Sequence, residues 1–524
     1  MRLAPAVTMA DVTVRSGKGW SRAAVLLTLG VVLLFIVLVW VGTSGIRGSD
    51  QYWYVADVES LIDGRGVQTN EIYPVTIRHE IAPLPRPFVH NILNVYVAAL
   101  PALLFGGYGG WIVLNLVSSL LTAFLIYCTV VRIADSRAAW VAGVAYLLLP
   151  ATVWATTQPL AEASTAPLVA LAAYVYVVAG VSYWRWVLLI VIAALLVACR
   201  PTFVLLLPLI PLAYVAHTAP RQSGTFARAA GLAAVGGTLW LLGKHLLEPH
   251  VLVSYLQVIG SDGPKFSNMT SFFDLSPEPP TISAVVANAV KGLAIQFTKI
   301  DTGYLLFYLP FNILALTPFA LLRGHERAEV TRVAAAGLVA LALHLITALL
   351  VRNQFRYLLV ATPPLVVVAG VVFARVQWLR TIHAPAVLIA AAIVTLAAPS
   401  AAIAWRSHEE GIEHRRVRAT LAATFDETLP PGDTVMVALD LKGFEVQILG
   451  YVLRPRPVLY VYDRYDSDDY AALIKNAGAK WLMSRRDAPI LDRLAAHSLR
   501  HMRMLPAPFA EWSLFKIENG ERLP

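Results

Sequence analysis

Asp50 is the first residue whose type and position suggest catalysis. It lies about eight residues beyond the first long apolar run, in the aromatic-rich sequence 49–57, SDQYWYVAD. Trp and Tyr are enriched where a membrane meets water, and a carboxylate held there is partly desolvated. Desolvation raises the pKa of the carboxyl group toward that of a working general base. Asp50 is therefore a candidate base, and the alternative is a solvated loop aspartate beside an aromatic belt.

Glu162 is the second acidic candidate. It lies in the short polar sequence 157–164, TQPLAEAS, between two apolar runs. An ionisable group at the mouth of a helix bundle costs free energy unless it is paired or hydrated, so function is the first hypothesis for such a residue. The alternative is a carboxylate at a helix N-terminus, where the helix dipole stabilises a negative charge.

Three arginines are candidates for binding a phosphate group. Arg200 separates two apolar runs, and Arg352 and Arg356 lie in the short sequence before Tyr357. Positive residues are depleted on the outer side of membrane proteins, where we expect these three, so an anionic partner is indicated. The guanidinium fork matches the geometry of phosphate oxygens. Snorkelling to lipid headgroups is the alternative.

The amino-acid composition indicates the class of protein that holds these candidate residues in place. The 524 residues are 57% hydrophobic and 14% charged, whereas soluble domains are about 25% charged. Soluble, disordered and disulfide-rich classes are excluded, and a polytopic membrane protein is predicted. Cys128 and Cys199 are the two cysteines, too few for a cysteine zinc site. The net charge of +9 falls in the apolar part and not in the C-terminal tail, so we expect no nucleic-acid partner.

About eleven apolar runs predict the membrane-spanning helices. These runs are 23–42, 111–131, 138–156, 164–181, 186–199, 202–216, 229–247, 304–322, 333–351, 357–374 and 386–405. A further run, 88–105, is short and contains His90 and Pro101. The positive-inside rule places residues 1–22 in the cytoplasm if 88–105 lies in the outer interface or re-enters without crossing. Two long outer loops, 43–110 and 248–303, follow from this topology.

The tail, 406–524, has the composition of a small soluble domain. Strand-like sequences at 434–439, 457–462, 480–484 and 511–518 alternate with helical patterns near 443–453, 467–477 and 487–498. This alternation predicts a small α/β domain with a mostly parallel sheet. The tail contains no glycine-rich nucleotide-binding motif. It lies outside the cell in the predicted topology, which makes the whole chain a multi-pass protein of the cell membrane.

The order of these motifs resembles a family. Asp50 is followed by Tyr54, Ala56 and Gly64 in a long first outer segment, and a late Arg356–Tyr357 opens a proline-containing span. With the intervening juxtamembrane helix and the acidic second outer turn, this resembles the GT-C superfamily of membrane glycosyltransferases over about residues 20–405. The glycosyltransferase family 39-like branch of protein mannosyltransferases and lipid A aminoarabinose transferases is the most similar.

The resemblance implies an activity. The donor would be a sugar on a polyprenyl phosphate, and the acceptor a hydroxyl on a lipid, glycan or protein at the outer face. Asp50 would match the catalytic base and Glu162 the second acidic residue, with inversion at the anomeric carbon. The candidates for holding the donor phosphate are Arg200, Arg352, Arg356 and Tyr357. The candidates for the acceptor or sugar pocket are Tyr54, Arg86 and His90.

Two further expectations follow. Many relatives have Asp-Glu at the first site, whereas Gln51 follows Asp50 here, so the sequence does not support a metal site. We expect no cofactor, although a divalent cation remains compatible with the chemistry.

The rival classes are a secondary transporter and a non-catalytic envelope-assembly protein. Transporters bind at the midplane of repeated halves, but this sequence shows no repeat and its charges gather at the ends of the spans.

Overall fold

The computed structural model describes most of the predicted helices and strands. The described residues are 22–47, 49–66, 71–72, 92–178, 182–218, 224–247, 290, 294, 304–322, 328–350, 358–375, 385–439, 446–462, 467–494 and 498–518. Some side chains at segment ends, that of Asp50 included, are outside the description. The chain divides into two compact units. Unit 1 comprises Met1–Thr43, His90–Asn94 and Ile112–Ser407, and unit 2 comprises Ser44–Val89, Val95–Trp111 and His408–Pro524.

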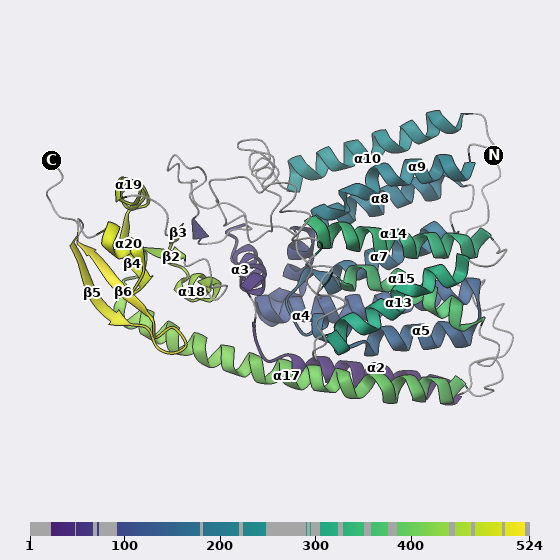
Figure 1. Cartoon of the computed structure of the whole chain (residues 1–524), viewed down its shortest axis with the longest axis horizontal. Coiled ribbons are helices and arrows are strands. Elements are labelled where there is room, and N and C mark those ends of the chain that lie inside the picture. Colours follow the sequence, from purple (N-terminus) through teal and green to yellow (C-terminus); the bar gives the residue numbers. More distant parts are fainter. Residues whose placement is uncertain are drawn as a thin grey trace. The chain divides into compact units, whose positions relative to one another are not determined.

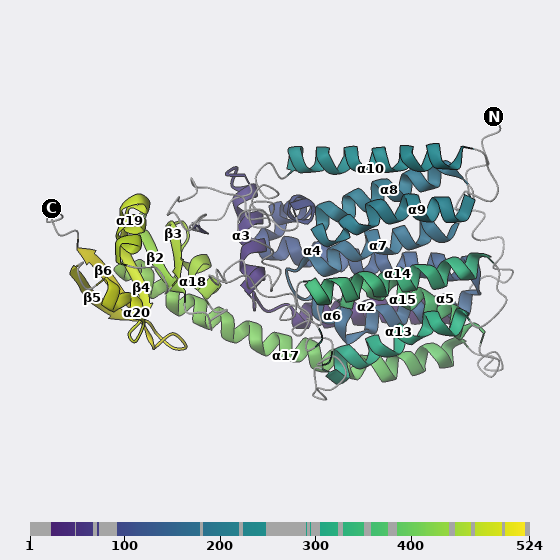
Figure 2. The same ribbon diagram turned by 45° about the horizontal axis from the view of Figure 1, so that its top comes forward.

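Unit 1 is a bundle of apolar helices (Figure 1). Its described elements are α2 (Arg22–Gly42), α5 (Ser136–Leu148), α6 (Pro150–Thr156), α7 (Ala161–Val178), α8 (Tyr183–Cys199), η1 (Pro201–Leu205), α9 (Leu206–Thr218), α10 (Thr225–Leu247), η3 (Tyr304–Tyr308), α13 (Leu309–Leu322), α14 (Ala328–Leu350) and α15 (Leu358–Phe373). Most of α4 (Ile92–Ile133) and the first part of α17 (Pro385–Thr428) also belong to it. Helices α7, α8, α9 and α14 lie side by side in both views (Figure 2).

The helices of unit 1 are apolar around most of their circumference, as is typical of helices that contact lipid or a membrane bundle. Large apolar side chains such as Leu29, Leu33 and Trp40 of α2 are exposed on the outside of the unit. By length and composition, α2, α4, α10 and α14 could each cross a membrane, and the pair α5–α6, bent by 53° at Leu149, could form a fifth span. Each of the eleven predicted runs contains helix, but the number of spans stays a prediction.

Helix α4 is interrupted at Gly106. This residue has φ +71° and ψ 170°, a conformation that glycine adopts without the strain that a Cβ would cause. The helical segment before the break coincides with the ambiguous run 88–105. Of that region, Val95–Trp111 groups with unit 2 and Ile112 onward with unit 1. That this segment does not cross the membrane stays a prediction.

Unit 2 contains a six-stranded sheet with strand order β1-β3-β2-β4-β6-β5. The strands are β1 (Glu71–Ile72), β2 (Thr434–Leu439), β3 (Val458–Tyr462), β4 (Ala479–Arg485), β5 (Ser498–Met504) and β6 (Trp512–Glu518). The first four in the order are parallel, and β6 and β5 continue antiparallel. The helices of this unit are α3 (Ser49–Ile62), α18 (Val446–Leu453), α19 (Ser467–Ala477) and α20 (Pro489–Arg493), with the end of α17.

The small sheet that the tail predicts is present, with two differences. Strand β5 follows the short α20, where the sequence predicted a helix over 487–498. Strand β1 comes from the first predicted outer loop and pairs with β3 in the register Glu71–Val458 and Ile72–Leu459. Strand β2 and the middle of β4 are mostly apolar, as is typical of strands with both faces buried; Val435, Val437 and Leu482 are fully buried.

Candidate functional site

Glu162 and Arg200 form a buried ion pair in unit 1. Glu162 lies in the first turn of α7, and Arg200 is the C-cap of α8, directly before the 3-10 turn η1. Their Oε1 and Nη1 atoms are 3.2 Å apart, and the two side chains are 5% and 14% exposed. The first turn of a helix suits a carboxylate because the helix dipole stabilises its charge. The sequence indicated both residues separately, and the structure brings them together.

Two asparagines form hydrogen bonds with residues close to this pair in the sequence. Asn115 of α4 donates through Nδ2 to the carbonyl oxygens of Gln158, at 2.6 Å, and Leu160, at 3.2 Å, and so holds the turn that leads into α7. Asn94 donates to Thr165 Oγ1 at 3.2 Å, one helical turn from Glu162. Neither asparagine was among the predicted site residues. Their signal was a carboxamide inside an apolar run, where polar groups mark structural or functional contacts.

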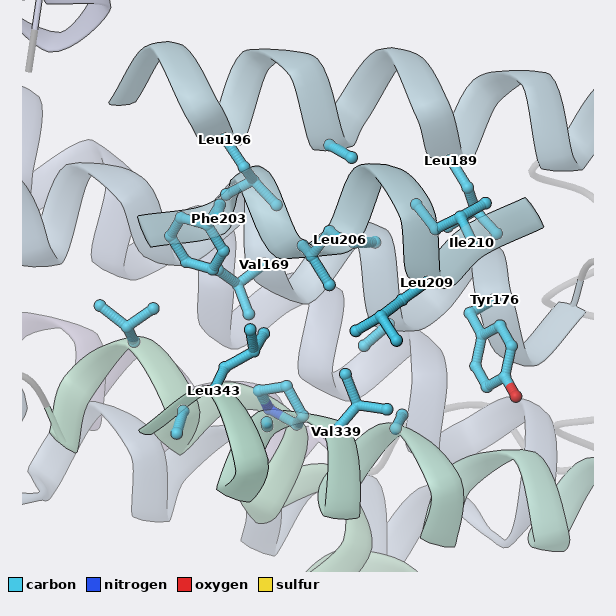
Figure 3. A pocket seen from close by; sticks show the side chains of 18 of the residues that line it. Val169, Tyr176, Leu189, Leu196, Phe203, Leu206, Leu209, Ile210, Val339 and Leu343 are labelled. Carbon is cyan, nitrogen blue, oxygen red and sulfur yellow. The ribbon is translucent and has the colours of Figure 1, made fainter. Parts of the chain in front are cut away.

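An apolar pocket of about 160 Å³ adjoins Arg200. It is lined by α7, α8, η1, α9, α14 and α15, and its lining side chains are almost all hydrocarbon (Figure 3). Leu196, Phe203 and Leu343 gather at one end and Tyr176 lies at the other. Arg200, which lies between Leu196 and Phe203 in the sequence, is also among the residues that line the pocket.

The pocket also borders the outer apolar surface of unit 1. Leu209 of α9 and Val339 of α14 face each other across it (Figure 3), and these side chains are 43% and 40% exposed. His344 lines the pocket, is 4% exposed, and makes a hydrogen bond through neither ring nitrogen within the described part of the chain. Its ring packs edge-on to Phe311 with 4.8 Å between centroids.

Asp50 and Tyr54 belong to unit 2. Asp50 is the second residue of α3, a helix of 14 residues in place of the expected loop. Gln51 is buried, and its Oε1 accepts a hydrogen bond of 3.0 Å from the backbone N–H of Arg47, so this residue caps the entry to the helix. Tyr54 packs against Trp111, with ring centroids 5.5 Å apart, and its carbonyl accepts the indole N–H at 2.9 Å.

The remaining site predictions lie outside the described residues. These are Arg86, His90, Arg352, Arg356 and Tyr357. Among the residues that the structure describes, no three His, Cys, Asp or Glu side chains are arranged to hold a metal ion. The expectation that no cofactor is needed stays a prediction.

Comparison with known proteins supplies the fold family. No family profile matches the sequence, and no curated protein matches it. The structure matches that of ArnT from Cupriavidus metallidurans bound to undecaprenyl phosphate with TM-score 0.59 and 14% identity, over 95% of this chain and 99% of ArnT. The chain has the GT-C fold. The apo form of that ArnT gives TM-score 0.57 and 16% identity, over 94% of this chain and 98% of ArnT.

A second GT-C protein is also similar. Archaeal oligosaccharyltransferase AglB from Archaeoglobus fulgidus, in complex with an inhibitory peptide and a dolichol-phosphate, gives TM-score 0.51 and 12% identity, over 88% of this chain and 69% of AglB. These structural matches show the GT-C fold, which the motif order predicted. A fold hosts many activities, so the activity of this chain has to be argued from its own residues.

Proposed function

We propose that this GT-C chain is an integral membrane glycosyltransferase. It transfers a sugar from a polyprenyl-phosphate-linked donor to an acceptor hydroxyl on the extracytoplasmic side of the cell membrane. The observation that carries the proposal is the apolar pocket whose lining includes the cationic residue Arg200. An elongated hydrocarbon chain with an anionic head satisfies both parts of such a pocket, because the chain removes apolar surface from water and the head pairs with the guanidinium.

The GT-C fold supports the same class of ligand. ArnT and AglB were solved with undecaprenyl phosphate and a dolichol-phosphate, which are both polyprenol-type lipid phosphates. The exposed Leu209 and Val339 give a lipid in the bilayer a route into the pocket between α9 and α14, without passage through water. A secondary transporter is the alternative function, and it would move its ligand across the membrane without breaking a bond.

The proposed reaction is a displacement at the anomeric carbon. Asp50 takes the proton of the acceptor hydroxyl while the hydroxyl oxygen attacks that carbon from the face opposite the phosphate. The bond between the anomeric carbon and the phosphate oxygen breaks, so the configuration inverts and the polyprenyl phosphate leaves as an anion. Arg200 stabilises the charge that develops on the leaving oxygen. Glu162 holds the Arg200 side chain in place, and Arg352 and Arg356 remain candidates for further phosphate contacts.

The experiment is a transfer assay with the purified protein in lipid nanodiscs, a panel of labelled polyprenyl-phosphate sugars, and lipid, glycan and peptide acceptors that carry free hydroxyl groups. We expect one donor to be active, and the amount of sugar transferred to the acceptor should equal the amount of polyprenyl phosphate released. A donor with the same sugar phosphate on a short, water-soluble chain is the control, because it lacks the hydrocarbon that fills the pocket. Vesicle uptake of an intact donor without bond cleavage would replace the transferase by a transporter.

A further inference from the structure

Helix α3 is held by the C-terminal part of the chain through a cluster that we call the Glu59 clasp, formed by Glu59 of α3 with Tyr451 of α18 and Arg454, the residue that follows α18. Arg454 Nη2 and Glu59 Oε2 are 2.7 Å apart, and the side chains are 17% and 30% exposed. The Tyr451 hydroxyl donates to Glu59 Oε1 at 3.3 Å. The Glu59 carboxylate therefore accepts hydrogen bonds from two donors, one in α18 and one directly after it, and these two bonds restrict both its position and its orientation.

Aromatic rings extend the clasp along α3. The Arg454 guanidinium lies 3.9 Å from the centroid of the Tyr451 ring, and that ring packs 5.1 Å from the ring of Tyr52. Arg418 of α17 lies 5.8 Å from both tyrosine centroids. These distances fall within the range of cation–π attraction. The cluster therefore joins α3, α17 and α18 by several contacts that must be broken together.

Another partner of α3 within unit 2 is the Val95–Trp111 part of α4. A Cβ added to Gly107 would lie 2.5 Å from Cγ of Glu59 and 3.1 Å from the carbonyl oxygen of Val55. Glycine at 107 thus permits the close approach of the two segments. Together with the Trp111–Tyr54 contacts, this leaves α3 little freedom to rotate while the clasp is closed.

The segment around α3 is attached to the C-terminal part at two more places. Before α3, the Ser44 hydroxyl donates to the carbonyl oxygen of His408 at 2.7 Å, and Gly411 lets the backbone of Gly45 approach α17 closely. After α3, strand β1 pairs with β3. Residues 44–72 are therefore anchored at their start, middle and end to residues beyond 407.

The angular spacing of residues around α3 relates the clasp to the position of Asp50. Tyr52 and Glu59 are seven residues apart and so lie on the same face of α3, about 20° from one another, at about 100° per residue. Position 50 falls about 180° from position 59 on the same helix. The clasp thus grips one face of α3, and the position of the proposed base lies on the other.

We propose that Arg454 and Tyr451 are positioning residues for the transfer reaction: by gripping Glu59 and Tyr52 they set the rotation of α3 and hence the place of Asp50. This gives the C-terminal sheet domain a role in catalysis without contact with substrate. The inference rests on the proposed function for the identity of the base. The anchoring of α3 by the clasp can be tested without it.

The test compares three variants of the full-length protein in nanodiscs. Arg454→Ala should lower kcat by about 10- to 100-fold, the size of effect expected from a small misplacement of a catalytic group, while the KM for the donor stays unchanged because the pocket is intact. Glu59→Arg combined with Arg454→Glu should recover much of kcat. Arg503→Ala is the matched control, because it breaks the 2.6 Å Arg503–Glu427 ion pair of the same unit without touching α3, and its kcat should equal that of the wild type.

A second readout separates the two proposals. Amide hydrogen exchange of residues 51–62 should accelerate in Arg454→Ala and not in Arg503→Ala, and this measurement needs no substrate. Unchanged exchange and unchanged kcat in Arg454→Ala would overturn the positioning role and leave the transferase intact. Accelerated exchange in a protein that transfers no sugar from any donor would overturn the proposed function and leave the anchoring of α3 standing. A kcat loss equal in Arg454→Ala and Arg503→Ala would also overturn the positioning role.

Discussion

Glu162 and Arg200 stabilise each other, because both charges are largely buried and each offsets part of the desolvation cost of the other. Arg200→Ala removes a cation from the lining of the pocket and leaves the Glu162 carboxylate without this partner. Breaking one side of a buried pair costs about 3–5 kcal/mol of stability, and donor phosphate binding should weaken as well. Thermal unfolding and binding of a labelled polyprenyl phosphate measure the two effects.

The control for this variant is Arg485→Ala. Arg485 pairs with Asp487 and Glu511 at the surface, where an ion pair contributes only about 0–1 kcal/mol. It should change neither donor binding nor stability to a comparable extent. Unaltered donor affinity in Arg200→Ala would remove Arg200 from the phosphate site.

Asp50→Asn tests the proposed base. Asparagine retains the shape of the side chain but cannot accept a proton at neutral pH, and general base catalysis contributes about 10²–10⁴-fold. Turnover should fall by that factor while donor binding persists. Asp63→Asn is the matched control, since Asp63 is exposed just after the same helix and pairs with Arg65 at 2.8 Å. A folded Asp50→Asn protein that keeps more than about a third of the wild-type turnover would contradict the assignment, because the expected loss is at least about 100-fold.

The sequence indicated individual site residues better than their partners. Glu162 and Arg200 each stood out as charges at the ends of apolar runs, but their pairing depends on how α7 packs against α8, which no local pattern encodes. The hydrogen bond from the Arg47 backbone to Gln51 was not predicted either. From the sequence alone, Gln51 was noted only because many relatives have a glutamate at this position. The Glu59 clasp joins residues 395 apart in the sequence, and such contacts are set by tertiary structure.

At the scale of elements, Asp433 joins the start of β2 to β4. It accepts a hydrogen bond from Lys480 Nζ at 2.7 Å and another from the Trp481 indole at 3.0 Å. The hydrogen bond from Lys480 is the largest influence that lowers the pKa of Asp433 below its usual value of 3.8, with the Trp481 bond adding to it and burial opposing it. Because the folded state holds the proton less tightly, the contribution to stability is present above pH 3.8 and is lost as the pH falls through the folded pKa.

Asp433→Asn should therefore reduce the acid sensitivity of the sheet. In the wild type, hydrogen exchange of β2 and β4 amides, corrected for the intrinsic pH dependence, should accelerate as the pH falls below 3.8. In the variant this part of the pH dependence should be missing, and exchange near neutrality should be faster because the ionic partner of Lys480 is gone. Identical pH profiles in the two proteins would contradict this account of the strand pair.

Elements with a strong local pattern were predicted well. The apolar runs became helices, and the predicted strands near 434, 457, 480 and 511 became β2, β3, β4 and β6. Strand β5 was missed because its sequence, SLRHMRM, places basic residues where a buried strand would be apolar; it lies at the edge of the sheet, where such residues are typical. Strand β1 is only two residues long and is specified by β3, so its own sequence carries no signal.

At the scale of the whole molecule, the topology is a prediction from the distribution of Lys and Arg. Alkaline phosphatase is active only outside the cytoplasm, so a fusion near residue 410 should be active and one near residue 325 inactive. The comparison of the two fusions, with expression measured by immunoblot, checks the orientation. The reverse pattern would contradict the eleven-span topology and place 88–105 among the spans.

The attachment of residues 44–72 to strands and helices near the far end of the sequence has a consequence for biosynthesis. Glu59 and Arg454 are 395 residues apart, and ribosomes add about 5–20 residues per second. Helix α3 must therefore wait roughly 20–80 seconds after its own synthesis for the partners that hold it. During this interval α3 lacks the contacts with residues beyond 407, so we expect the proposed activity to arise only when the C-terminal part has folded. A chain that ends upstream of residue 446 would lack the partners of Glu59, and we expect it to lack the proposed activity.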